Sequence, residues 1–209
     1  MKKKTLEIGG FISGAILIAF GVAVIVLGVS GRSTVNDSLK QEQIVGTPDM
    51  TPALIKAEAT KAGLTNVTFP TRSVAGKAIT NGTDARTFAQ YMRIHTLEAT
   101  GGVPYAQMSR YATADGKGTN DAAKALQSKG QPVANTAREI WVTETALTTA
   151  LNVSYMASQL SLFSIVIGAA LLLTGIGFVV LDWAALHRRR EKTATEKSAV
   201  ATPRQAAIA

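Results

Sequence analysis

Two apolar segments without any charged residue constrain this chain more than any other feature of its sequence. Residues 8–29 and residues 160–181 contain no Asp, Glu, Lys or Arg. As α-helices, with a rise of 1.5 Å per residue, each segment would be roughly 33 Å long, and this length crosses a hydrocarbon core of about 30 Å. The sequence therefore predicts two transmembrane helices.

The first segment also has a competing interpretation as a cleaved signal peptide, because Lys2, Lys3 and Lys4 precede it. Its apolar run is longer than the roughly 7–15 residues typical of a signal-peptide core. The only small-residue sequence at the end of this run, Val29-Ser30-Gly31, is a poor signal-peptidase cleavage site. We therefore expect the first segment to be retained as a membrane span.

Basic residues near the span ends predict the orientation in the membrane. Lys2–Lys4 precede the first span and Arg188–Arg190 follow the second, whereas residues 139–159 contain no Lys or Arg. Because Lys and Arg accumulate on the cytoplasmic side, we expect both termini in the cytoplasm. The expected domains are a cytoplasmic N-tail (1–7), the first span (8–29), an extracytoplasmic helical domain (30–159), the second span (160–181) and a basic, disordered cytoplasmic C-tail (182–209).

The composition excludes several classes of protein. The chain has no cysteine and only two histidines, which rules out disulfide frameworks, zinc ribbons, iron–sulfur clusters and cysteine nucleophiles. The net charge is +8, and its basic excess flanks the spans, which suits anionic lipid headgroups. The basic tails lack the aromatic residues and the base-contacting residues that nucleic-acid-binding proteins combine with basic ones. We therefore expect membrane lipids as partners and no nucleic acid.

The segment between the spans is expected to be helical, which makes the whole chain an all-α membrane protein. Capping residues, Pro and Gly delimit the expected helices. A last helix begins after Pro132 and runs without Pro or Gly to Gly168, so we expect a stalk that continues into the second span. The expected helices cover residues 52–62, 84–100, 104–111, 119–129 and 133–187, and residues 66–78 are expected to form a loop or a short strand.

Small residues recur every seven positions in both spans. A spacing of seven keeps residues on one helix face, and small residues allow close approach of helices in lipid. A helix-packing seam is one interpretation, and the ordinary glycine content of membrane spans is the other. The expected seam residues are Gly14, Gly21, Gly28, Ser161, Gly168 and Gly175.

The stalk shows two further heptad series, one through Ile140 and Leu147 and one through Glu144 and Leu151. Both series also contain Ala, Ser or Glu, which weakens the coiled-coil pattern. The pattern fits either a weak coiled coil with another chain or a face that is covered by this chain's own helices.

Candidate polar residues give no catalytic pattern. His95 and Glu98 share one helix face and would suit a metal, but Phe88 and Tyr91 extend the same face as an apolar stripe, which favours a hydrogen-bonded core histidine. Neither a GxSxG elbow nor a phosphate-binding loop is present. We therefore expect no enzyme, no cofactor and no metal site. A polar cluster of buried or surface ion pairs is expected among Arg93, His95, Glu98, Arg110 and Glu144, with Glu139 as a further candidate.

Three stretches, EQIVGTPDMTPALI (42–55), YMRIHTLEATGGVPYAQMSRY (91–111) and IWVTETALTTALNVSYMA (140–157), resemble a family of two-span membrane proteins from actinobacteria. The resemblance covers nearly the whole chain between the spans and implies a cell-envelope setting. Some members are labelled aromatic ring-opening dioxygenases. Non-haem iron of that kind needs two histidines and a carboxylate, and this chain has one histidine on each expected side of the membrane.

Two classes of function remain. The first is a non-catalytic accessory or scaffold subunit of a cell-envelope complex, which packs against a membrane-protein partner or a second copy. The second is an extracytoplasmic binding or sensing module, with the GTPDMTP turn and the His95 helix lining a pocket and a partner on the cytoplasmic side.

Overall fold

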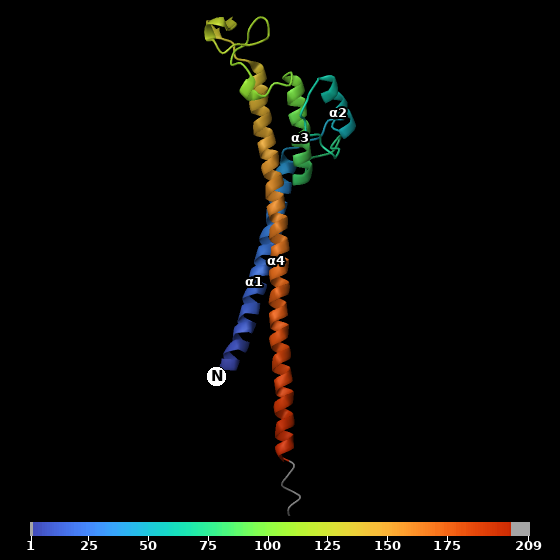
Figure 1. Ribbon diagram of the computed structural model, residues 1–209, viewed down its shortest axis with the longest axis vertical. Helices are drawn as coiled ribbons and strands as arrows, with labels where there is room; N and C mark the ends of the chain where they lie inside the picture. The colour runs from blue at the N-terminus through green and yellow to red at the C-terminus, as the bar shows by residue number, and fades with distance from the viewer. Residues whose placement is uncertain (1, 202–209) are drawn as a thin grey trace, which may run out of the picture. The chain divides into compact units, whose positions relative to one another are not determined.

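The computed structural model describes residues 2–201, and the side chains of residues 9–195 within them. Most of the described chain is helical (Figure 1). The four α-helices are α1 (Lys2–Gln41), α2 (Pro52–Lys61), α3 (Gly82–Ala99) and α4 (Thr136–Ala201). Two of them, α1 and α4, contain stretches long and apolar enough to cross a membrane.

The chain divides into two compact units. One, here called the span unit, combines residues 1–30 with residues 161–209. The other, here called the interspan domain, comprises residues 31–160. The helices α1 and α4 each contribute to both units, because each continues well past its apolar segment.

Both long helices extend further than their expected spans. After its apolar segment α1 continues to Gln41. The expected stalk was placed at 133–187, whereas α4 begins at Thr136 and continues to Ala201. The expectation of a disordered C-tail from 182 is therefore wrong as far as Ala201. Residues 191–201 contain Ala, Glu and Lys but no Gly or Pro, and extending an existing helix avoids the cost of nucleating a new one. Residues 202–209 lie outside the described part.

Side-chain caps begin both α2 and α3; α2 begins at Pro52 as expected, whereas α3 begins at Gly82, two residues before its expected start. The Thr51 side chain accepts a hydrogen bond from the Leu54 amide at the start of α2, and Pro52 occupies the first turn. At the start of α3 the Asn81 side chain accepts from the Asp84 amide. Both side chains satisfy amides that a helix start leaves without a backbone partner.

These caps position the apolar faces that build the core of the interspan domain. Figure 1 shows α2 and α3 beside the part of α4 that precedes residue 160. Residues 66–78 form a loop with bends and no named strand, which agrees with the expected loop or short strand. Val74 of this loop is buried in the core. The buried core side chains come from every one of these elements: Leu39, Met50, Ile55, Ala59, Val74, Ile79, Ala85, Phe88, Ala89, Tyr91, Ile94 and Leu151.

The segment 101–135 contradicts two expected helices. Residues 104–111 form only a single 3-10 turn, η1 (Tyr105–Gln107). Residues 119–129 form a second 3-10 turn, η2 (Ala122–Lys124), and then the strand β1 (Gln127–Ser128), which pairs with β2 (Gln131–Pro132). Backbone groups in this segment bond to one another across the chain instead of along a helix, as in the Leu126 amide donating to the Ala112 carbonyl. A helix as short as the one expected at 119–129 is marginal without an apolar face to bury.

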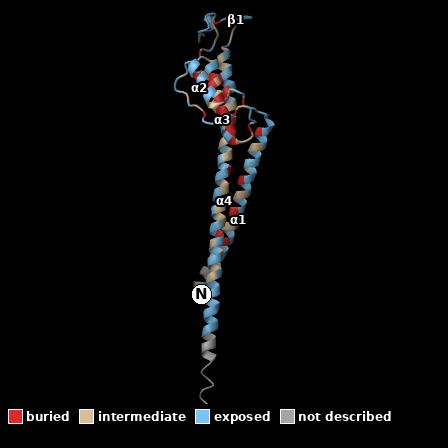
Figure 2. Cartoon of the chain, turned by 90° about the vertical axis from the view of Figure 1, so that its right-hand side faces the viewer, coloured by how far each residue is buried: buried red, intermediate tan, exposed pale blue. Residues whose placement is uncertain are grey.

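The part of α4 in the interspan domain has one covered side. Trp141, Glu144 and Leu151 are buried. Exposed residues occupy much of the remaining surface, as the pale blue segments of α4 show (Figure 2). The series through Glu144 and Leu151 therefore packs within this chain, whereas in the other series Ile140 is 42% exposed and Leu147 is partly buried against the core.

Candidate functional site

The span unit brings the small residues of the expected seam face to face. A Cβ atom added to Gly14 would lie 2.9 Å from the Gly175 carbonyl oxygen, and one added to Gly21 would lie 2.7 Å from that of Gly168. One added to Gly28 would lie 2.7 Å from the Ser161 carbonyl oxygen. These distances leave no room for a side chain, so the two helix backbones are in direct contact.

This contact is formed within a single chain. Each of the glycines 14, 21 and 28 meets a small residue of α4 in the same molecule. The seam therefore joins the apolar segments of α1 and α4 into a hairpin, and its glycines are not available to a partner helix. Any partner must use another surface.

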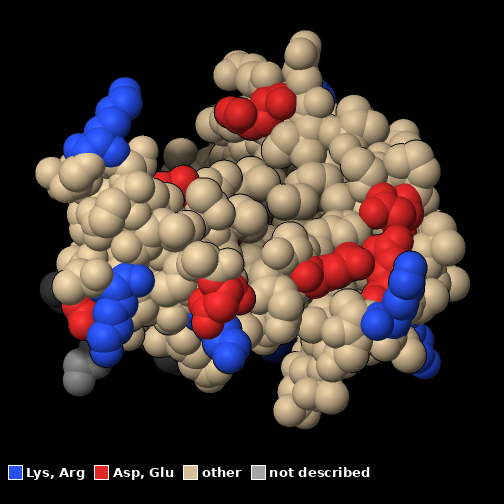
Figure 3. Space-filling model, turned by 90° about the horizontal axis from the view of Figure 1, so that it is seen from above, with Lys and Arg blue, Asp and Glu red and all other residues tan. Residues whose placement is uncertain are grey.

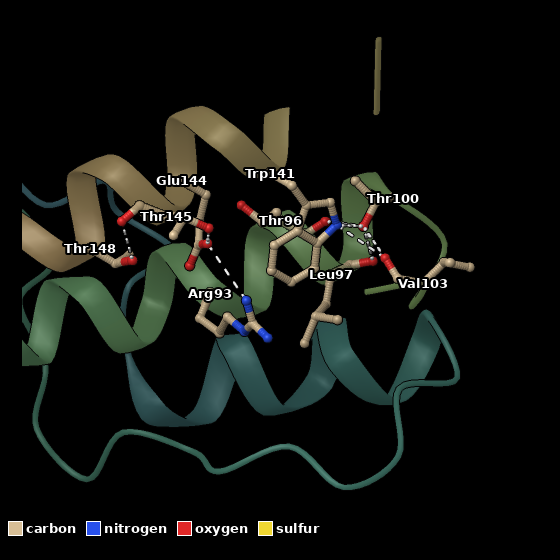
Figure 4. A network of polar contacts seen from close by, with 9 residues as sticks. All are labelled: Arg93, Thr96, Leu97, Thr100, Val103, Trp141, Glu144, Thr145 and Thr148. Carbon is tan, nitrogen blue, oxygen red and sulfur yellow. Dashed lines mark hydrogen bonds and ion pairs between the residues drawn. The ribbon is translucent and has the colours of Figure 1, made fainter. Parts of the chain in front are cut away.

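In the interspan domain, a polar network links α3 to α4 (Figure 4). The Arg93 guanidinium lies 3.6 Å from a Glu144 carboxylate oxygen and 4.0 Å from the centre of the Trp141 ring. The Glu144 side chain is only 3% exposed, and Arg93 is half-exposed. Pairing with Arg93 offsets the cost of burying the Glu144 carboxylate, and the cation–π contact holds the guanidinium in place.

Trp141 also fixes the chain that follows α3. Its indole N–H donates to the Thr100 hydroxyl at 3.1 Å and to the Val103 carbonyl at 3.0 Å. The indole thus anchors the end of α3 on the first turns of α4. This network positions the residues of a neighbouring groove.

An open groove with a volume of about 810 Å³ lies between α3, α4 and residues 65–68. Its lining contains two arginines, Arg86 and Arg93, together with Tyr155 and several Thr and Asn side chains. The Arg86 guanidinium lies 4.7 Å from the centre of the Tyr155 ring. The groove therefore presents two guanidinium groups that aromatic rings hold in place, one of which already pairs with Glu144.

The other residues of the expected polar cluster do not join this network. His95 lies on a different side of α3, against residues from α2 and the preceding turn. Glu98 and Glu139 are exposed. The Arg110 backbone amide donates to the Asn120 side chain. Among the described residues, only Arg93 and Glu144 of the expected cluster are within ion-pair distance of each other.

His95 instead lies between two carboxylates that the sequence analysis did not select. Its Nε2 atom is 3.4 Å from an Asp49 oxygen, and its Nδ1 atom is 3.8 Å from a Glu58 oxygen. One potential ligand atom from each of the three side chains lies within 4.8 Å of the others. The side chains are partly buried, with exposed fractions of 24% for His95, 33% for Glu58 and 37% for Asp49.

Two atoms of this group, Glu58 Oε2 and His95 Nε2, are buried and make no hydrogen bond with the described residues, although His95 Nε2 lies 3.4 Å from an Asp49 oxygen. Buried polar atoms in proteins normally have a partner, so such atoms indicate a place for a further ligand. Sequence reasoning paired His95 with Glu98 because they are three residues apart on one helix. Asp49 and Glu58 are distant in sequence, and only the GTPDMTP turn, which contains Asp49, pointed toward this place.

Charged residues elsewhere on the interspan domain are mixed in sign. On the face in Figure 3, acidic and basic side chains lie next to one another in small groups. Larger uncharged areas separate these groups. This face offers no extended basic surface of the kind that binds a nucleic acid backbone.

Comparisons with known proteins add no assignment: no family model, curated protein or solved structure matches the chain.

Proposed function

We propose that the chain is a non-catalytic scaffold or accessory protein of the bacterial plasma membrane that acts through helix packing. In this proposal both termini are cytoplasmic and the interspan domain is extracytoplasmic. The two apolar helices support a membrane location. The charge distribution of the sequence supports the orientation.

The observation that carries this proposal is an uncovered apolar stripe on α4 within the interspan domain. The stripe residues are spaced alternately four and three apart, which is the spacing of a coiled-coil seam. Val142 and Val153 are each 58% exposed and Met156 is 70% exposed, whereas the exposed Leu160 is the first residue of the expected second span. Large apolar side chains that recur on one exposed helix face support an interaction site there. The stripe comprises Val142, Ala146, Thr149, Val153, Met156 and Leu160.

A second copy of this chain is the occupant that the stripe fits best. Two copies inserted with the same orientation present α4 in parallel and at the same depth, so equivalent stripe residues meet in register, as in a parallel coiled coil. Charge does not oppose this contact, because residues 145–160 contain no Asp, Glu, Lys or Arg. The covered side of α4, with Trp141 and Leu151, remains packed on the chain's own core.

Cysteine cross-linking in native membranes tests the proposal, because the chain has no native cysteine. Met156→Cys places a thiol on the stripe, and we expect mild oxidation to convert a large fraction of this variant into a disulfide-linked dimer. Gln159→Cys is the matched control: it is exposed, lies within one turn of Met156 and flanks the stripe without belonging to its four-and-three spacing, which continues at Leu160. We expect the control to remain monomeric.

Equal cross-linking of the two variants would show random collision and would refute the proposal. A Met156→Cys protein that stays monomeric, while its thiol still reacts with a maleimide, would refute it as well. A maleimide-modified thiol shows that the residue is accessible, so absence of dimer then means absence of contact.

The groove beside α3 favours a second candidate function, an extracytoplasmic ligand-binding module. Its two stacked guanidinium groups suit a small carboxylate or phosphate ligand, since Arg forms bidentate hydrogen bonds with both. The test is a thermal-shift screen of the purified protein with small carboxylates and phosphates. A stabilising ligand whose effect is lost in Arg86→Gln supports this function, and a screen without any such ligand counts against it.

A further inference from the structure

We propose that Asp49, Glu58 and His95 form a binding site for a divalent transition-metal ion of the zinc type. The proposal is independent of the scaffold function, because the three residues lie away from the α4 stripe. It replaces the sequence-based expectation of no metal site. That expectation considered the two histidines and Glu98, and not the two carboxylates that the fold brings to His95.

The donor set is the first support. One imidazole nitrogen and two carboxylate oxygens are ordinary ligands of Zn²⁺, with bonds of about 2.0–2.2 Å. Around a tetrahedral ion, ligand atoms at these bond lengths are about 3.3–3.6 Å apart. The three donor atoms lie within 4.8 Å of one another, so small side-chain rotations suffice to close them around an ion.

The charge balance is the second support. The two buried carboxylates in the interspan domain each have a permanent cation: Asp84 lies 2.8 Å from Lys77, and Glu144 lies 3.6 Å from Arg93. Among the described residues, Asp49 and Glu58 pair only with His95, and neither pairs with Lys or Arg. With a neutral histidine the site carries two negative charges, which a divalent cation neutralises.

The orphaned atoms are the third support. Glu58 Oε2 and His95 Nε2 are both buried without a hydrogen-bond partner among the described residues. Leaving such atoms without a partner costs free energy, and a metal ion removes that cost. The partial exposure of the three side chains leaves room for water to complete the coordination, as in zinc sites with three protein ligands.

The fold holds the ligands on separate elements. Asp49 belongs to the turn before α2, Glu58 to α2 and His95 to α3. Ile55 and Ala59 of α2 are fully buried, and so is Tyr91 of α3, which keeps both helices in place. An ion at this site would therefore join the turn, α2 and α3 by coordination.

The test is a zinc titration of the full chain in mild detergent, after treatment with a chelator, in competition with a chromophoric zinc indicator. We expect one tightly bound Zn²⁺ per chain. Changing only the hydrogen-bonding partners of a ligand weakens metal affinity about 10–100-fold, so loss of the ligand in His95→Gln should weaken it at least about 100-fold. The near-isosteric variant Glu58→Gln should weaken zinc binding at least about 10-fold.

Two matched controls come from the same chain. Glu98→Gln makes the same change on α3 near His95, at an exposed position, and His187→Gln removes the other histidine. Both should bind zinc as the parent does. Helix content from circular dichroism confirms that each variant is folded before its affinity is compared.

Three results would overturn the proposal. One is a parent protein that binds no zinc at micromolar concentration. Another is a folded His95→Gln protein whose zinc affinity equals that of the parent. The third is an X-ray absorption spectrum of the zinc complex that shows two imidazole ligands, because this site supplies one. None of these results bears on the cross-linking of α4, so the two proposals can fail separately.

Discussion

The glycine seam predicts that a single methyl group in the first span destabilises the hairpin. In Gly21→Ala the new Cβ atom would lie 2.7 Å from the Gly168 carbonyl oxygen and 2.7 Å from the Leu172 amide nitrogen. Both are backbone atoms, which cannot rotate away. Since non-bonded atoms pack best at about 3.5–4.0 Å, α1 and α4 must separate locally by roughly 0.8 Å or more.

That separation sets the size of the effect. A gap of about 0.5–1 Å forfeits a quarter to a half of the dispersion energy of each contact that it opens. Overpacking of a fitted interface costs typically about 1–3 kcal/mol, and we expect Gly21→Ala to fall within this range. The change does not damage α1 as an isolated helix, because Ala is a better helix former than Gly.

The assay is the thermal unfolding of the full chain in mild detergent, with Gly177→Ala as the matched control. A Cβ atom at Gly177 meets nothing within 4 Å, so this variant adds the same methyl group to a span without touching the seam. Gly21→Ala should lower the melting temperature and Gly177→Ala should not. Equal melting temperatures would refute the argument that backbone contact at Gly21 holds the two spans together.

Three further predictions concern the interspan domain and the orientation. Burial raises the pKa of Tyr91 above its usual 10.0, so the folded chain holds this proton more tightly than the unfolded chain. Its contribution to stability is therefore complete below about pH 10 and is lost above it; Tyr91→Phe should flatten the alkaline decline of the melting temperature. Trp141→Phe removes both indole hydrogen bonds and should cost about 2–3 kcal/mol in thermal unfolding. For orientation, Asp115→Cys should react with an impermeant maleimide in intact cells, and Thr195→Cys should react only after lysis.

Local signals explain which parts of the fold the sequence predicted. The two long apolar helices follow from long apolar runs, and the start of α2 follows from Thr51, whose capping bond forms within three residues. The segment 119–129 was expected to be a helix. Its structure depends instead on backbone bonds to distant residues, such as the Val133 amide donating to the Leu126 carbonyl, and no local pattern reports these.

The candidate site shows the same limit. Arg93 and Glu144 were recognised as residues of one polar cluster, although the sequence does not show that α3 and α4 place them 3.6 Å apart. His95 was paired with Glu98 because helix geometry relates residues three apart. Its actual neighbours, Asp49 and Glu58, depend on how α2 packs on α3, which is a property of the core.

The apolar stripe on α4 was readable from the sequence, but two other heptad series hid it. A long helix that is apolar on several faces gives overlapping periodicities, and only burial by the rest of the chain separates them. Burial of Trp141, Glu144 and Leu151 shows which face is used internally. Val153 and Met156 then remain exposed in the interspan domain, whereas Gly168 and Gly175 are buried in the span unit. A substitution at Met156 should therefore separate copies while the hairpin stays intact, and a substitution at Gly21 should loosen the hairpin first.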